Sequence, residues 1–144
     1  MTSSVELPEL PDADLPGVFE GTVPPGVYRC SSVGPDVLMQ AEAAGWLGAV
    51  IDLSDVTDKA GFMDSCATGL ELPDWFGRNW DALADCLTDL SWWSETPRGY
   101  LVMTAGWRGF EQAAPEDANT AAEIFTAAAG YWTVRDTPLT ALLG

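Results

Sequence analysis

Three aspartates are spaced four residues apart within LPDWFGRNWDALADCLTDL, residues 72–90: Asp81, Asp85 and Asp89. On a helix this spacing places all three carboxylates along one side. Like charges at this spacing repel, and each pair costs an isolated helix about 0.2–0.5 kcal/mol. Such a row can bind cationic side chains of a partner, hold a divalent cation or act as an acid–base pair. A merely solvated polar face is the alternative that the pattern leaves open.

Position along the helix separates the three aspartates. Asp81 follows the predicted N-cap Asn79, and an acid near a helix N-terminus gains about 0.3–1 kcal/mol from the helix dipole. Asp85 lies in the middle of the predicted helix and Asp89 near its C-terminal end, where the dipole gives no such gain. Helix stability therefore does not explain Asp85 and Asp89, which favours a binding role.

An aromatic loop precedes the helix. Asp74, Trp75, Phe76 and Gly77 follow Pro73, so large rings are held close to the helix start. Aromatic rings beside charged groups are typical of a recognition surface, in which the rings supply contact area and the carboxylates supply orientation. We expect Phe76 to lie in the core and Trp75 to take part in recognition.

The charge balance of the chain limits its partners. Among 144 residues, 22 are acidic and 6 are basic, which gives a formal net charge of −16. This charge repels nucleic acid and anionic membranes and attracts a basic protein. Solubility alone is the other explanation of so acidic a composition.

Residue types argue against catalysis and metal binding. The chain has no histidine, the commonest general base and metal ligand. Its three cysteines, Cys30, Cys66 and Cys86, match no metal-ligand spacing and fit a reducing compartment. Residues 1–21 lack the features of a signal peptide, and no apolar run is long enough for a membrane span. We therefore expect a cytoplasmic protein with no cofactor and no metal.

Strands and helices alternate along the chain. Apolar runs predict strands at residues 26–30, within 48–56, at 100–105 and at 139–143. Helical spacing of apolar residues predicts helices at 35–46, 58–70, 79–90 and 115–132, with one helical turn in WRGFEQ. This order predicts an α/β domain with a mostly parallel sheet. Residues 1–25 are acidic and rich in proline, and we interpret them as a loosely held extension.

Residues 72–88 closely resemble the signature of the barstar family, intracellular inhibitors of a secreted ribonuclease. That signature runs Leu-Pro-acid-aromatic-aromatic-Gly-x-Asn-x-Asp-Ala-Leu-x-Asp-Cys-Leu-Thr, and this chain fills every fixed position. A weaker resemblance extends over residues 49–143 through AVIDL and YLVMTAGWRGFEQ. It implies a barstar-like fold, with a three- to four-stranded sheet packed with helices. Residues 26–144 then form the domain, with an added N-terminal strand and helix.

The resemblance also implies a function. In barstar the helix and the loop before it enter the ribonuclease active site, where aspartates meet the cations that hold RNA phosphate. It implies that this chain is no enzyme but blocks a basic, secreted, guanyl-type microbial ribonuclease in a 1:1 complex, and is a monomer when free. The partner-binding residues are then Asp74, Trp75, Gly77, Asn79, Asp81, Asp85 and Asp89.

Some positions depart from the family. Ala84 stands where barstar has a contact tryptophan, and Ala127 where it has a contact glutamate. The loop at residues 91–99 is longer and carries Trp92, Trp93 and Glu95. These differences favour a ribonuclease other than barnase as the target. An immunity protein of this fold against a toxin that is not a ribonuclease, or a domain with no toxin partner, are the alternatives.

Overall fold

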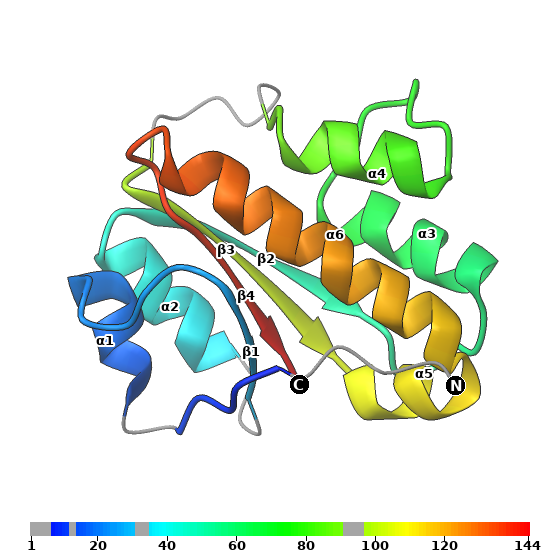
Figure 1. Ribbon diagram of the computed structural model, residues 1–144, viewed down its shortest axis with the longest axis horizontal. Helices are drawn as coiled ribbons and strands as arrows, with labels where there is room; N and C mark the ends of the chain where they lie inside the picture. Colours follow the sequence, from blue (N-terminus) through cyan, green and yellow to red (C-terminus); the bar gives the residue numbers. More distant parts are fainter. Residues whose placement is uncertain (1–6, 12–13, 31–34, 91–96) are drawn as a thin grey trace.

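The computed structural model describes residues 7–11, 14–30, 35–90 and 97–144. Its centre is a four-stranded sheet in the order β1-β4-β3-β2, in which every neighbouring pair is parallel (Figure 1). The strands are β1 (Val27–Arg29), β2 (Trp46–Asp52), β3 (Gly99–Ala105) and β4 (Leu139–Leu143). The predicted α/β fold with a mostly parallel sheet is confirmed.

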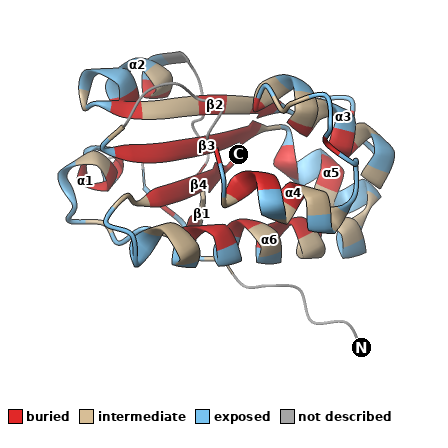
Figure 2. Cartoon of the chain, turned by 90° about the horizontal axis from the view of Figure 1, so that it is seen from above, coloured by how far each residue is buried: buried red, intermediate tan, exposed pale blue. Residues whose placement is uncertain are grey.

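Helices cover both faces of this sheet. They are α1 (Leu15–Glu20), α2 (Pro35–Ala43), α3 (Lys59–Gly69), α4 (Trp80–Leu87), α5 (Trp107–Ala113) and α6 (Pro115–Thr133). Figure 2 shows α2 and α6 on opposite sides of the strands. The buried side chains form two clusters, one under α1 and α2 and one under α3 to α6. The sheet is therefore the middle of three layers.

The two central strands show why this layering is necessary. Every residue of β4 is buried, as is every residue of β3 except Ala105 (Figure 2). Leu101 and Met103 face the α1–α2 cluster, whereas Tyr100 and Val102 face the other cluster. Continuous apolar runs of this kind are typical of parallel strands that are covered on both faces.

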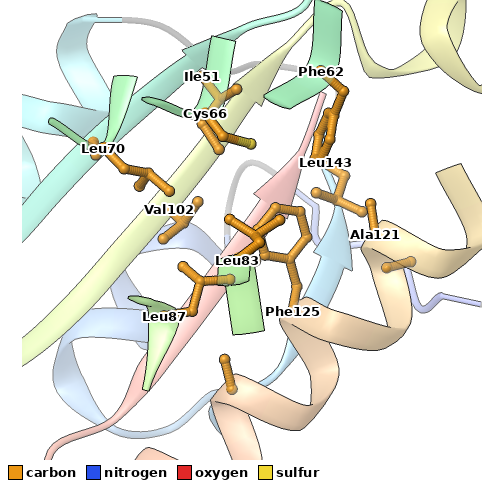
Figure 3. Packing of buried hydrophobic residues seen from close by; sticks show 14 of the residues in the cluster. Ile51, Phe62, Cys66, Leu70, Leu83, Leu87, Val102, Ala121, Phe125 and Leu143 are labelled. Carbon is orange, nitrogen blue, oxygen red and sulfur yellow. The ribbon is translucent and has the colours of Figure 1, made fainter. Parts of the chain in front are cut away.

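Helix α6 lies close to the sheet because its buried side is mostly alanine. The buried residues of this helix are Ala118, Ala121, Ala122, Phe125, Ala128 and Ala129. Small side chains let the helix axis approach the strands, while the Phe125 ring fills the space between α6 and α4 (Figure 3). The prediction of a helix at residues 115–132 is confirmed, and α5 is longer than the single turn expected.

The described part of the N-terminal segment is packed onto the fold, so the interpretation of a loosely held extension is wrong there. The Leu10 N–H donates to the Arg29 carbonyl at 2.8 Å, which ties the segment to β1. Leu10, Leu15 and Val18 are all buried in the cluster under α1 and α2. Helix α1 has six residues, too few for its apolar spacing to reveal a helix.

Smaller differences concern the ends of elements. The helix predicted at residues 35–46 stops at Ala43, because Gly45 takes a left-handed conformation with φ of +83° and β2 then starts at Trp46. The expected loop at 91–99, with Trp92, Trp93 and Glu95, lies largely outside the described residues.

Leu15→Ala tests whether α1 belongs to the core. Leu15 is 7% exposed, so its truncation leaves a cavity, and we expect a loss of about 2–5 kcal/mol in the free energy of unfolding. Glu20→Ala, at an exposed position of the same helix, is the control and should change stability by less than about 0.5 kcal/mol. Urea unfolding measures both; equal effects would show that α1 does not contribute to the core.

Candidate functional site

The loop before α4 begins with a tight turn that presents two side chains to solvent. The Phe76 N–H donates to the Pro73 carbonyl at 3.0 Å, which places Asp74 and Trp75 at the centre of the turn. Trp75 is 64% exposed, whereas Phe76 is 8% exposed and belongs to the core. The prediction for Phe76 is confirmed. Its buried ring anchors the loop, and the exposed Trp75 ring lies at the tip.

The second half of the loop is held by two side chains. Arg78 has a φ of +54°, the left-handed region, and forms an ion pair with Asp64 of α3. A non-glycine residue in this region costs about 1–3 kcal/mol and persists where its surroundings demand it. Gly77 does not adopt a positive φ; a Cβ there would lie 3.2 Å from Nδ2 of Asn79. Gly77 therefore provides space for the Asn79 side chain.

Asn79 is the N-cap of α4, as predicted. Its Oδ1 accepts a hydrogen bond from the Ala82 N–H at 2.8 Å, and its Nδ2 donates to the Gly77 carbonyl at 3.3 Å. One side chain thus satisfies a free N–H of the first turn and ties the loop to the helix. Asp81 lies in that first turn.

The inward face of α4 is apolar and well packed. Leu83, Cys86 and Leu87 are fully buried, and Figure 3 shows both leucines gathered with Phe125 of α6. Trp80 packs against Phe62 of α3, with ring centroids 5.7 Å apart. The helix is therefore fixed by α3 at its start and by α6 along its length.

Contacts at the C-terminal end of α4 determine where Asp89 lies. The Leu87 carbonyl accepts a hydrogen bond from Nε1 of Trp132 in α6 at 2.7 Å, and Thr88 Oγ1 donates to the Ala84 carbonyl at 3.0 Å. Leu90 then turns back into the core with a φ of +54°. Asp89 consequently lies in a turn two residues after the helix, so the prediction that all three aspartates share one helix is wrong for Asp89.

The carboxylates form an exposed acidic surface. Asp74, Asp81, Asp85 and Asp89 are all exposed. Burial raises the pKa of the Cys86 thiol on the inner side of the helix, and the negative charges of Asp85 and Asp89 raise it further. Two cationic side chains lie beside the loop and the start of α4. Arg78 is paired with Asp64, and Lys59 Nζ lies 5.6 Å from the centre of the Trp80 ring.

The structure brings most of the predicted site residues together. Asp74, Trp75, Gly77, Asn79, Asp81 and Asp85 follow one another through the loop and α4. Sequence reasoning missed the residues that support them, Lys59, Asp64, Arg78 and Trp132. Their contacts join separate elements, so no local spacing signals them. Of the two positions that depart from barstar, Ala84 is half-buried in α4 and Ala127 is exposed on α6.

Neither a metal site nor a membrane-spanning helix is found in the part of the chain that the structure describes. Within the described ranges, no group of three or more Cys, Asp or Glu side chains is placed to hold a metal ion. None of the helices that the structure describes has the length and apolar character needed to cross a membrane.

Comparison with protein-family models gives a match over the C-terminal two thirds of the chain. A family model described as Barstar (barnase inhibitor) matches residues 46–144, which is more than half of the chain. The match runs from the start of β2 to the end of the chain and contains the loop and α4. A search of curated proteins found no match.

Asn79→Ala measures what the cap contributes. It removes the acceptor of the Ala82 N–H, so we expect a loss of about 0.5–2 kcal/mol in the free energy of unfolding. Asn79→Asp keeps an acceptor and adds a charge that the helix dipole favours, so it should stay close to the wild type. Urea unfolding of both variants is the measurement. Equal losses in both variants would mean that Asn79 stabilises the protein through its hydrogen bond to the Gly77 carbonyl and not as a helix cap.

Proposed function

The chain belongs to the barstar family, and from this premise we propose that it inhibits a basic, secreted, guanyl-type microbial ribonuclease. In this proposal it is a cytoplasmic protein and a monomer when free, and forms a 1:1 complex. The loop at residues 72–79 and α4 block the active site of the enzyme. The observation that carries the proposal is the pair of exposed carboxylates, Asp81 and Asp85, on a helix whose opposite face is buried.

Asp81 and Asp85 are suited to imitate RNA phosphates. They lie one helical turn apart, where Cβ atoms are about 5–6 Å from each other. A ribonuclease that binds phosphates with lysine and arginine side chains offers the matching cations, and a carboxylate accepts charge-assisted hydrogen bonds from both types. The proposed role of these aspartates is therefore to occupy phosphate positions without being cleaved.

The loop contributes contact area and direction. Trp75 is a large ring in a backbone turn closed by the Phe76 N–H, and a tryptophan offers this contact area at a low entropy cost because only two side-chain angles are fixed when it is covered. Gly77 and Asn79 keep the loop close to the helix start, and Asp74 lies beside Trp75 in the turn. Asp89, beyond the end of α4, contributes charge at the edge of the surface. Aromatic anchors surrounded by polar groups are typical of tight interfaces.

The overall charge supports a basic partner. A net charge of −16 speeds the approach of a positively charged enzyme through long-range attraction. The same charge disfavours nucleic acid as the ligand of this chain. The small side chains of Ala84 and Ala127 remove two contacts that barstar uses, which supports a ribonuclease other than barnase as the target.

Inhibition of secreted ribonucleases tests the proposal. The purified chain should not cleave RNA, and it should abolish the activity of a basic guanyl-type ribonuclease at a molar ratio close to one. The measurement is titration of a fluorogenic RNA substrate assay with a panel of small secreted ribonucleases, with bovine serum albumin as the protein control. Inhibition of a secreted toxin with another activity, and of no ribonuclease, would favour the immunity protein. RNA cleavage by the chain itself would contradict the proposal.

Asp85→Ala separates binding from stability. In the free protein it removes a repulsion with Asp81 and introduces a better helix former, so stability should stay the same or rise by about 0.2–0.5 kcal/mol. In the complex it strips a carboxylate from a desolvated cationic site, which should cost about 2–5 kcal/mol of binding free energy. Thermal unfolding and inhibition constants give the two numbers.

Two variants control for that result. Glu42→Ala removes one exposed negative charge from α2, on the opposite side of the sheet, so it reports the effect of net charge alone. Asp89→Ala removes a carboxylate beyond the end of α4 and should weaken binding much less than Asp85→Ala. If Asp85→Ala unfolds the protein or weakens binding no more than Glu42→Ala, the aspartate is not a phosphate mimic.

A further inference from the structure

A second candidate site shares no lining residue with the proposed inhibitory surface, which consists of the loop at residues 72–79, α4 and Asp89. A cavity of about 460 Å³ opens beyond the carboxyl ends of β1 and β4, and its walls include Leu10, Arg29, Trp107, Arg108 and Leu143. Figure 1 shows residues 7–11 passing these strand ends close to the C-terminus of the described chain. The cavity has the size of a small-molecule site.

The topology of the sheet makes this position a favourable one for a ligand. After β1 the chain continues to α2 on one face, whereas after β3 it continues to α5 and α6 on the other face. Ligands of open parallel sheets bind in the crevice where successive connections leave in opposite directions. The cavity lies in that crevice, with Cys30 after β1 and Trp107 after β3 on its walls.

A smaller cavity of about 200 Å³ adjoins the first, and Arg29 and Trp107 line both. The Arg29 guanidinium is held by Glu111, with Nη1 and Nη2 donating to the two carboxylate oxygens at 3.1 and 2.6 Å. This bidentate contact, and the nearby charge of Glu9, raise the pKa of Arg29. The charge of Arg29 is thereby matched by acids of the chain itself.

Trp107 supplies a hydrogen-bond donor that the fold does not use. Its side chain is 2% exposed, and its Nε1–H is buried without an acceptor anywhere in the described ranges. Buried donors are nearly always paired, because an unpaired one loses its hydrogen bond to water and gains nothing in return. Nε1 itself is covered by neighbouring atoms, so an acceptor of a molecule in the cavity satisfies this group only once the side chains around the ring shift on binding.

Arg108, the residue after Trp107, supplies a positive charge. It is exposed on the wall of the larger cavity, and no ion pair involves it among the residues that the structure describes. The same wall also carries Glu9, whose charge lies near Arg29, so Arg108 is the cation on this wall whose charge is left for a ligand. Leu10, Pro11 and Leu143 add apolar surface to the same wall.

From these contacts we propose that the cavity binds a small organic acid with an apolar body. The carboxylate of this ligand pairs with the Arg108 guanidinium and accepts a hydrogen bond from Trp107, while its apolar part contacts Leu10 and Leu143. Leu10 and Arg29 precede residue 46, where the match to the barstar family begins. No residue of the loop at 72–79 or of α4 lines the cavity, so the site is distinct from the proposed inhibitory surface and its test does not depend on inhibition.

The experiment follows the indole N–H of Trp107 by nuclear magnetic resonance. The chain has 7 tryptophans, whose indole signals are few enough to resolve, and Trp107→Phe identifies the signal in question. The probe is 2-naphthoate, and the comparison ligand is 2-naphthamide, which has the same shape but no charge. With 2-naphthoate we expect the Trp107 signal to move downfield to saturation, and with 2-naphthamide we expect binding weaker by about tenfold.

Two exposed arginines provide the variant and its control. Arg108→Gln should weaken the binding of 2-naphthoate about tenfold without affecting the fold. Arg98→Gln removes the same charge at the amino end of β3 and should leave binding unchanged. The proposal is overturned if the Trp107 signal does not saturate, if both probes bind equally well, or if the two variants weaken binding equally.

Discussion

The parallel sheet must be covered on both faces, and the rest of the structure depends on this constraint. The side chains of β3 and β4 are almost all buried, so neither face can be left to water. Helices α3 to α6 cover one face, and α1 and α2 cover the other. Helix α4 is placed in the outer layer by α6, and its polar side faces solvent. The position of the acidic surface is therefore a consequence of how the core is closed.

The acidic surface contains features that reduce the stability of the fold, and the buried face of α4 offsets them. Asp81 and Asp85 repel each other, Arg78 adopts a left-handed conformation, and Trp75 leaves a large ring in water. Against this, Leu83 and Leu87 are fully buried, and burial of such a side chain contributes about 1.5–3 kcal/mol. The fold thus fixes the loop and α4, on which the proposed binding residues lie, before any partner arrives, and such preorganisation reduces the entropy lost on association.

Much of the fold and most of the candidate site could be predicted from local pattern. Long apolar runs predicted the strands, and the N-cap Asn79, the buried Phe76 and the start of α4 follow from residue type and spacing. The short helix α1 could not be predicted, because its stability comes from packing in the core cluster on that face of the sheet, where Phe19 contacts Trp46 of β2, and not from its own sequence. The end of α4 was missed for a related reason: the Trp132 indole bonds the Leu87 carbonyl across 45 positions of the chain, and no local signal reports such a contact.

The separation of the two faces of α4 has a consequence for evolution. Leu83, Cys86 and Leu87 carry the packing, whereas Asp81 and Asp85 lie outside it. A lineage can therefore exchange the outward residues one at a time, and each intermediate still folds. In a protein with this arrangement, point substitutions can change what the outer surface recognises while the interior stays the same.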